Sequence, residues 1–414
     1  MLKPFMIGVP VFLSFAFGAG RLSAATHRVG PCSGSQYGTI GAAITAAQPG
    51  DMIEICPGLY PEQLVVSKPL TLRGITANGY NRVLIQPTLA PVSGLSTQAV
   101  ITVLNTNGVT LQNLAIDASH NSISGCGSDV PALAGVHFSS SSGILENSAI
   151  FGAQVMDPAS CAGALPFGNG FGVQVDAAQA GSYQLWIGNN SIHDYTSNGI
   201  QVNGTGIGVE IAGNSISGVG PALGTFQFAV FILNGATANI HQNIITEGLC
   251  GALSPSDCIN VRSEGVTLRA IGDGTIVDSN VITNAQSGIF INGANRLRVS
   301  NNQIRNIDAM SGMDIQASAS GVFTNSVILN NGIFNVGPID MNASNNEEGC
   351  GIDEYSGTGT FSGNQLWENA VTDAYCGVAH VGADVVQLGA YFDVLYNELN
   401  SDDYPSAFPP AVEP

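Results

Sequence analysis

Two short hydrophobic patterns alternate along most of the chain. In the first, a small residue opens four residues in which apolar and variable positions alternate. It occurs at Gly135-Val-His-Phe, Gly172-Val-Gln-Val, Gly199-Ile-Gln-Val, Ala229-Val-Phe-Ile, Cys258-Ile-Asn-Val, Gly288-Ile-Phe-Ile, Gly312-Met-Asp-Ile, Gly351-Ile-Asp-Glu and Gly377-Val-Ala-His. The second is Asn-Xaa-Ile or a close relative, at Asn190, Asn214, Asn243, Asn280, Asn302 and Asn364, with looser copies at Asn113, Asn147 and Asn325. A period of two is typical of strands that bury one face.

The Asn pattern sets the length of the repeat. Two uninterrupted steps, Asn280 to Asn302 and Asn302 to Asn325, cover 22 and 23 residues, which is room for three short strands and three turns. The aliphatic positions are mostly Ile and Val, which favour strand. We predict an all-β, three-sheet, right-handed parallel β-helix of ~22-residue coils. The corner asparagines are expected to bond one another from coil to coil and to tolerate the left-handed backbone of a tight corner.

Both ends of the chain differ from the repeat. Residues 1–24 combine a basic start, an apolar stretch and small residues, which predicts a secretory signal peptide; an uncleaved membrane anchor is the alternative. Apolar residues on one helical face predict a capping helix over 37–48, with coils from about residue 52. The β-helix is expected to span residues 25–400, followed by a Pro-rich tail over 401–414.

Charge and cysteine content narrow the cellular setting. The formal net charge of −19 disfavours nucleic acid, which is bound mainly through Lys and Arg. No membrane span is expected after the signal, and we expect a monomer in the periplasm or outside the cell.

Eight cysteines in an exported chain predict up to four disulfides. Cys32 and Cys56 are expected to tie the cap to the first coil. Cys126 and Cys161 fall in two insertions, Cys250 and Cys258 bracket a third, and Cys350 and Cys376 occupy matching positions of consecutive coils.

A family resemblance rests on the N-terminal part of the repeat. The segments Ala42-Ala43-Ile44 through Ala47, Pro49-Gly50-Asp51-Met52-Ile53, Pro57-Gly58-Leu59-Tyr60-Pro61-Glu62 and Leu70-Thr71-Leu72-Arg73-Gly74 resemble the first module of the pectin-lyase-like superfamily. The corner and strand repeats extend the resemblance to about residue 395. The resemblance implies a β-helix whose enzymes place substrate along the first sheet, formed by the Gly-Ile-Xaa-Val strands. It does not specify a reaction.

Two outward columns of the first sheet are therefore the candidate binding surface. The expected first column is His137, Gln174, Gln201, Phe231, Asn260, Phe290, Asp314, Asp353 and Ala379. The expected second column is Ser139, Asp176, Asn203, Leu233, Arg262, Asn292, Gln316 and Tyr355. Polar groups interspersed with aromatics suit sugar rings and hydroxyls, so we expect a polysaccharide partner; an ordinary solvated sheet is the alternative. Insertions at 118–134, 152–171, 218–228, 247–257 and 337–349 fall before first-sheet strands and are expected to wall the cleft.

Asp314 and Asp353 form the sharpest candidate pair. If their strands belong to consecutive coils, the carboxylates face each other roughly 5 Å apart and could raise each other's pKa. Such a pair serves glycoside cleavage, or a calcium site with Glu354, Glu347 or Glu348 as further ligands. An additional coil strand at 332–334 would separate the pair.

A second carboxylate candidate precedes the fifth strand pattern. Ser256-Asp257-Cys258-Ile259 is similar to the Asp-Asp-Cys-Ile strand of polygalacturonases, which implies a catalytic role for Asp257. Ser256 replaces the first carboxylate, and the Gly-His-Gly and Arg-Ile-Lys signatures are absent, which argues against that activity. Arg262 is a candidate partner for a uronate. Two hypotheses follow: a secreted β-helix that binds polysaccharide and cleaves it as a lyase or glycoside hydrolase, and a non-catalytic surface or matrix β-helix for adhesion or carbohydrate binding.

Overall fold

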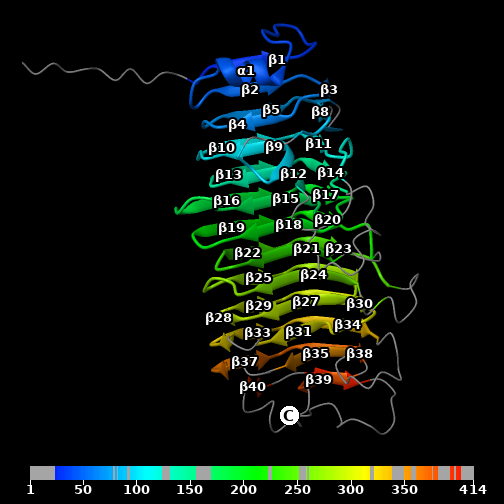
Figure 1. Ribbon diagram of the computed structural model, residues 1–414. Coiled ribbons are helices and arrows are strands. Elements are labelled where there is room, and N and C mark those ends of the chain that lie inside the picture. Colours follow the sequence, from blue (N-terminus) through cyan, green and yellow to red (C-terminus); the bar gives the residue numbers. More distant parts are fainter. Residues whose placement is uncertain are drawn as a thin grey trace, which may run out of the picture.

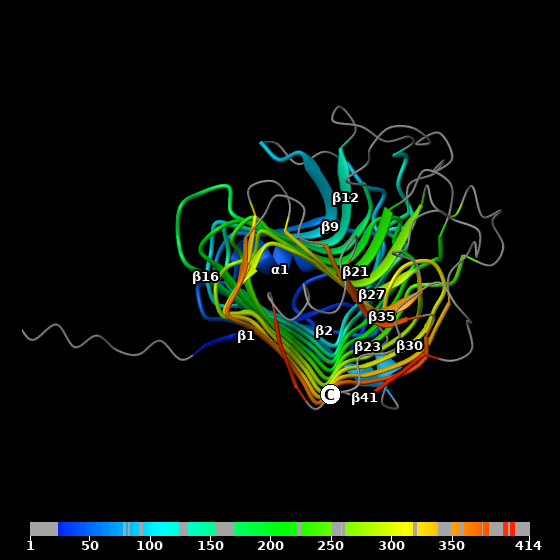
Figure 2. The same cartoon turned by 90° about the horizontal axis from the view of Figure 1, so that it is seen from below.

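The chain winds into a column of stacked coils in the computed structural model (Figure 1), which describes residues 24–77, 80–81, 83–90, 94–123, 131–154, 169–221, 226–250, 258, 261–317, 321–337, 349–355, 360–374, 376–380, 392–395 and 398–401. Strands make up 57% of the described residues and helix 3%. Each coil gives one strand to each of three long sheets, and nearly every pairing is parallel. Viewed along the column, the strands of each sheet lie over one another (Figure 2). The predicted parallel β-helix is confirmed.

The strands are named here by sheet. Sheet A contains β1 (Thr26–Val29), β2 (Met52–Ile55), β5 (Thr71–Gly74), β10 (Val109–Gln112), β13 (Gly143–Glu146), β16 (Tyr183–Gly188), β19 (Ile207–Ala212), β22 (Thr237–His241), β25 (Ile276–Asp278), β29 (Arg298–Ser300), β33 (Val327–Leu329), β37 (Asn364–Trp367) and β40 (Phe392–Leu395). Sheet B contains β3 (Gly58–Tyr60), β8 (Val83–Ile85), β11 (Ala115–Asp117), β14 (Ala149–Phe151), β17 (Ser191–His193), β20 (Ser215–Ser217), β23 (Ile244–Thr246), β26 (Val281–Ala285), β30 (Gln303–Ile307), β34 (Gly332–Val336), β38 (Ala370–Ala374) and β41 (Glu398–Ser401).

Sheet C is the predicted first sheet. It contains β4 (Leu64–Val66), β9 (Thr97–Leu104), β12 (Ala132–Ser139), β15 (Phe171–Asp176), β18 (Asn198–Asn203), β21 (Phe226–Leu233), β24 (Arg262–Arg269), β27 (Ser287–Asn292), β31 (Met313–Gln316), β35 (Cys350–Tyr355) and β39 (Cys376–His380). Two small sheets complete the fold: β28 (Ala294–Asn295), β32 (Val322–Thr324) and β36 (Thr360–Ser362) are parallel, and β6 (Thr76–Ala77) pairs antiparallel with β7 (Tyr80–Asn81).

The interior of the column is filled by aliphatic side chains stacked in register. Val136, Val173 and Ile200 are successive partners in sheet C, and each is 0% exposed. Burying a side chain of this size stabilises the fold by about 1.5–3 kcal/mol, and alternate residues of each short strand supply one. The period of two in the sequence is therefore the inward face of each strand.

At the corner between sheets A and B, two adjacent residues share the two roles predicted for one asparagine, the left-handed backbone and the bonds from coil to coil. The first residue has a left-handed backbone, as at Asn147 (φ 51°) and Asn301 (φ 57°). The second stacks: Asn280 Oδ1 accepts from Asn243 N at 3.0 Å and from its Nδ2 at 2.9 Å, and the same bonds repeat one coil along. The stacked asparagines are Asn190, Asn214, Asn243, Asn280, Asn302, Asn331 and Asn369.

Asn364 was wrongly assigned to this corner. It is the first residue of β37, directly after the turn from β36, where its Oδ1 accepts from Ser326 N at 3.1 Å. Asn325 was wrongly assigned too, since it has a left-handed backbone at this second corner. The asparagine that stacks on Asn302 is Asn331, so the 23-residue step from Asn302 to Asn325 is not the length of a coil. The Asn-Xaa-Leu pattern at 364 resembles the others because both corners need a side-chain acceptor, and only the order of strands separates them.

One helix covers the N-terminal coil. Helix α1 (Ile40–Ala46) begins after Thr39, whose side chain accepts from Ala42 N, and it buries Ile40 and Ile44. Glu62, from the segment between β3 and β4, accepts from the free N–H groups of Ile40 and Gly41, which offsets their lack of partners in the first turn. The domain limits remain predictions. The signal and tail segments lie outside the described residues except for Ala24 and Ser401.

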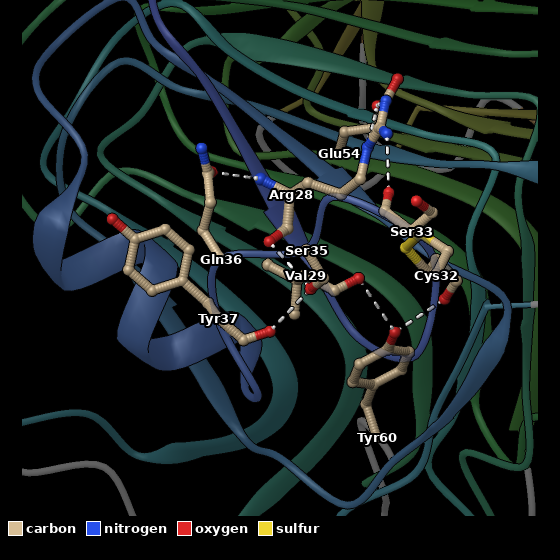
Figure 3. The surroundings of a disulfide bond; sticks show 10 residues. Arg28, Val29, Cys32, Ser33, Ser35, Gln36, Tyr37, Glu54 and Tyr60 are labelled. Carbon is tan, nitrogen blue, oxygen red and sulfur yellow. Dashed lines mark hydrogen bonds and ion pairs between the residues drawn. A yellow bond between two sulfur atoms is a disulfide. The ribbon is translucent and has the colours of Figure 1, made fainter.

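The predicted disulfide Cys32–Cys56 joins the segment after β1 to the residue that follows β2 (Figure 3). Nearby, the Arg28 side chain donates to Glu54 at 2.6 and 2.9 Å. Arg73 also binds Glu54, and together the two guanidinium groups lower the pKa of the Glu54 carboxyl. A disulfide and two ion pairs thus stabilise this end of the column. Within the described residues no helix is long and apolar enough to cross a membrane.

Candidate functional site

The outer face of sheet C carries two side-chain columns that run along the axis of the fold. In register, the first column is Val65, Thr102, His137, Gln174, Gln201, Phe231, Thr267, Phe290, Asp314, Asp353 and Ala379. The second column is Leu104, Ser139, Asp176, Asn203, Leu233, Arg269, Asn292, Gln316 and Tyr355. The predicted columns therefore hold in every coil except one.

The exception is the coil of β24, where two predicted residues are wrong. Thr267 occupies the place expected for Asn260, and Arg269 occupies the place expected for Arg262. The strand pattern is Gly265-Val-Thr-Leu, which follows the Cys258 segment and looks like it in sequence. Asn260 and Asp257 lie outside the described residues. Arg262 opens β24, paired with Phe226, well before the second column.

Asp314 and Asp353 are direct partners on neighbouring strands. Asp314 in β31 is in register with Asp353 in β35. The segment 332–334 belongs to β34 in sheet B, so it adds no strand between them. The 39-residue step from Asp314 to Asp353 is therefore a single coil with an insertion. Both side chains are buried, at 4% and 3% exposure.

Burial distinguishes the two columns. In the first column His137, Thr267 and Phe290 are at most 2% exposed, whereas Gln174 is partly exposed and Val65 is 39% exposed. Most of this column is therefore not the solvated face that the alternative predicted. In the second column Asp176, Asn203, Arg269, Asn292 and Gln316 are partly exposed. A ligand that approaches sheet C meets the second column first.

Hydrogen bonds link the two columns at both ends of the sheet. His137 Nε2 lies 2.7 Å from Asp176 Oδ2, and Ser139 donates to the other oxygen at 3.0 Å. Gln174 accepts from Thr97 at 3.0 Å. Toward the C-terminal end, Gln316 Nε2 donates to Asp314 Oδ2 at 3.1 Å. Second-column side chains thus bind the imidazole of His137 and the carboxylate of Asp314 in the first column.

A groove of about 550 Å³ lies beside the second column, at the edge where the chain turns from sheet C to sheet A. Arg269 and Asn292 line it, together with Asp273 and Asn295. The Arg269 guanidinium carbon is 5.4 Å from the centre of the Phe290 ring, an arrangement that holds the cation in place. Phe290 in turn is the register partner of Asp314. Arg269 is a candidate site residue that the sequence reading missed because the strand was displaced.

The long insertions lie at the opposite edge of sheet C. All of them connect a sheet B strand to the next sheet C strand, as between β14 and β15 or between β23 and β24. Cys250 and Cys258 form a disulfide across one insertion. Cys350 is disulfide-bonded and is the register partner of Cys376. Cys126 and Cys161 lie outside the described residues.

Arg262 contributes to this insertion edge. Its Nη1 lies 3.3 Å from Glu264 Oε1 and 3.2 Å from Met310 Sδ. Glu264 is 1% exposed and accepts from Thr267 of the first column at 2.6 Å. Arg262 therefore neutralises a buried carboxylate behind the first column. Among the described residues, its side chain contacts Glu264 and Met310 at this edge.

Asp308 is a perturbed acid beside the Cys250–Cys258 disulfide. Its Oδ2 accepts from Cys250 N at 2.7 Å. Burial raises the pKa of the Asp308 carboxyl to about 6. The insertion is therefore tied to the turn before β31 through an acid that titrates near neutral pH.

Replacing Asp308 by Asn is expected to remove part of the pH dependence of stability. The folded pKa of about 6 exceeds the ordinary value of 3.8, so the folded protein binds the proton more tightly than the unfolded chain does. The resulting stability is fully present below about pH 4 and is lost as pH rises through 6. Between these limits the wild type should lose on the order of 1–2 kcal/mol relative to the variant. Urea unfolding at pH 4 and pH 7 measures this; an identical pH dependence in both proteins would contradict it.

A second buried acid was not singled out from the sequence. Tyr195 and Glu247 are both 0% exposed, and the Tyr195 hydroxyl donates to Glu247 Oε1. Burial raises the pKa of the Glu247 carboxyl well above its usual range. Gln227, also 0% exposed, donates to Tyr195 O at 2.9 Å. Only the three-dimensional structure reveals this cluster, because its members come from three different coils.

The predicted calcium ligands are incompletely described. Glu347 and Glu348 lie outside the described residues, and for Glu354 and Tyr355 the structure describes the backbone alone. Among the described side chains no three His, Cys, Asp or Glu residues gather as a metal site.

The comparisons with known proteins concern the fold. A scan against protein-family models finds no match, and a search among curated proteins finds none. Among solved structures, the Dettilon tailspike protein is 14% identical with a TM-score of 0.51, over 86% of this chain and 63% of the tailspike. A mannuronic acid specific polysaccharide family 6 lyase from human gut microbiota is 11% identical, TM-score 0.48, over 90% of this chain and 87% of the lyase. The polygalacturonase from Erwinia carotovora ssp. carotovora is 13% identical, TM-score 0.45, over 90% and 97%. These are right-handed parallel β-helix proteins, and the likeness to the tailspike supports the same fold for this chain.

Proposed function

We propose that this protein binds a polysaccharide along the second column of sheet C and hydrolyses its glycosidic bonds with Asp314 and Asp353. The observation that carries the proposal is the register pairing of the two aspartates. Neighbouring strands are ~4.8 Å apart, close to the ~5–5.5 Å between the carboxyl groups of retaining glycosidases.

The surroundings of the pair suggest separate roles. Two adjacent buried carboxylates repel each other when both are ionised, so one proton shared between them is favoured. Gln316 donates to Asp314 at 3.1 Å, which stabilises the charged form of Asp314. Asp314 is then the nucleophile that attacks the anomeric carbon, while Asp353 protonates the leaving glycosidic oxygen. In the second step Asp353 takes a proton from water, and the water oxygen displaces the sugar from the Asp314 carboxylate.

The second column supplies the binding surface in this proposal. Asn203, Asn292 and Gln316 are partly exposed amides that can bond sugar hydroxyls. Arg269, held over Phe290, adds a fixed cation within the adjoining groove. The first column, with His137, Gln174, Gln201 and Phe290 among its residues, lies beside this surface on the same strands. The disulfides suit action outside the cytoplasm, in the periplasm or extracellular space.

Burial of the acidic pair favours one competing function. At 3–4% exposure the two carboxyl groups have little direct access to solvent. A surface or matrix protein that only binds carbohydrate would use the partly exposed second column and leave the aspartates as structural groups. Catalysis distinguishes the two functions.

The purified protein incubated with neutral and uronic-acid polysaccharides is expected to release reducing ends from one of them without forming unsaturated ends. The assay is run with calcium and with a chelator, and the two product types are measured in parallel. Unsaturated ends that require calcium would indicate a lyase and overturn the hydrolytic roles. Binding of a polysaccharide with no product from any substrate would support the adhesion function instead.

A further inference from the structure

A second groove lies on a different side of the column. It is on the outer face of sheet A, has a volume of about 510 Å³, and spans β13, β16, β19 and β22. Ile144, Trp186, Glu210 and Asn239 follow one another in register across these four strands. Gln184 and Thr237 line the groove beside them. Its side chains therefore form a line parallel to the axis of the column.

Glycines shape this groove by letting two side chains lie down on the sheet. A Cβ atom at Gly188 would stand 2.4 Å from Trp186 Nε1 and 2.5 Å from its Cε2. The indole thus occupies the space above Gly188 and lies along its own strand. In the same way, a Cβ at Gly208 would stand 2.7 Å from Gln184 Oε1. Side chains at these positions would fill the groove and lift the indole from the sheet.

The chemistry of the groove combines an aromatic platform with neutral hydrogen-bonding groups. The face of an indole carries partial negative charge, which attracts the C–H groups on one face of a sugar ring. Gln184, Thr237 and Asn239 offer donors and acceptors for hydroxyls next to that platform. We propose that this groove is a second carbohydrate site, which takes a neutral glycan chain lying along the column axis.

The charges argue for a neutral ligand. Among the described residues that line the groove, Glu210 is the one ionisable side chain, and its Oε1 lies 3.0 Å from His241 Nε2. These lining residues include no Lys or Arg, and the net charge of −19 adds to the repulsion of a uronate chain. A quaternary ammonium ligand is normally held by a cage of several aromatic rings. Trp186 is the one aromatic side chain among the lining residues.

This site does not depend on the proposed hydrolysis. Asp314 and Asp353 belong to sheet C, whereas every strand of this groove belongs to sheet A. A glycan held on sheet A would keep the protein on the polymer whether or not sheet C cleaves it.

The two tryptophans of the chain provide a direct test. Trp367→Phe leaves Trp186 as the single reporter, and Trp367, in β37 of the same sheet, serves as the matched control position. Titration of Trp367→Phe with cellohexaose, xylohexaose or mannohexaose is expected to give a saturable change in fluorescence with at least one of them. In gels containing the corresponding neutral polysaccharide, Trp186→Ala should bind at least tenfold more weakly than wild type. Trp367→Phe should bind like wild type.

Further variants keep the outcomes separate. Asn239→Ala should also weaken binding, and it replaces Trp186→Ala if that variant fails to give the wild-type circular dichroism spectrum. Asp353→Asn should lose hydrolysis and keep the Trp186 response. No response to any neutral hexaose would overturn the site, as would equal gel binding by Trp186→Ala. A response confined to oligogalacturonate or choline would overturn its assignment to neutral glycans.

Discussion

Hydrolysis is expected to fall at least about a hundredfold when either Asp314 or Asp353 is replaced by Asn. Asn is close in shape to Asp, so the buried packing of both residues is kept while the acid–base and nucleophilic chemistry is removed. The double variant should be little slower than either single variant, because the two groups act in one mechanism. Initial rates of reducing-end release measure all three variants.

Asp194→Asn is the matched control for this pair. Asp194 is an exposed carboxylate that lies 2.8 Å from its neighbour His193, in the turn before β18, which β21, β24 and β27 separate from β31 in sheet C. The same chemical change there should leave the rate within about twofold of wild type, since exposed groups remote from a site rarely affect it. Full activity in both Asp314→Asn and Asp353→Asn would remove the pair from the mechanism.

Replacing Asn280 by Ala is expected to lower the free energy of unfolding by about 2–4 kcal/mol. The Asn280 side chain accepts from Asn243 and donates to Ile240 O and Asn302. All of these groups are buried, so the substitution leaves donors and acceptors on both neighbouring coils without partners. Urea unfolding followed by circular dichroism measures the change.

Gln303→Ala tests whether the loss is specific to the stacked position. Gln303 is exposed in β30, immediately after the same corner. Its replacement should change the free energy of unfolding by no more than about 0.5 kcal/mol. Similar losses in both variants would mean that the asparagine stack adds no more than an ordinary surface residue.

Asp314 and Asp353 show which part of a residue's placement a sequence repeat predicts. Their place in a common column follows from the sequence, because each occupies the same position after a Gly-Xaa pair. Whether they are neighbours depended on the strand at 332–334, which is apolar enough to belong to any sheet. The structure assigns it to sheet B, and the aspartates become partners.

The coil of β24 marks the limit of the same reasoning. Cys258-Ile-Asn-Val and Gly265-Val-Thr-Leu both fit the strand pattern, and local propensity does not choose between them. Pairing with β21 and β27 does, because the chosen segment must bury Val266 and Leu268 between their register partners. Arg269 thereby replaces Arg262 in the second column.

The sequence by itself determined the coil and the inward residues, because the alternation of a strand and the turn preference of asparagine are local properties. It also placed most of the two columns of sheet C. Tertiary structure alone decided what covers or exposes those columns, since the burial of His137 or Phe290 depends on residues far away in the chain. It also decided where a groove forms on sheet A. There Trp186 lies over Gly188 of its own strand, and Gln184 lies over Gly208 of the neighbouring strand. Contacts between coils depend on the lengths of the intervening insertions, which no period in the sequence encodes.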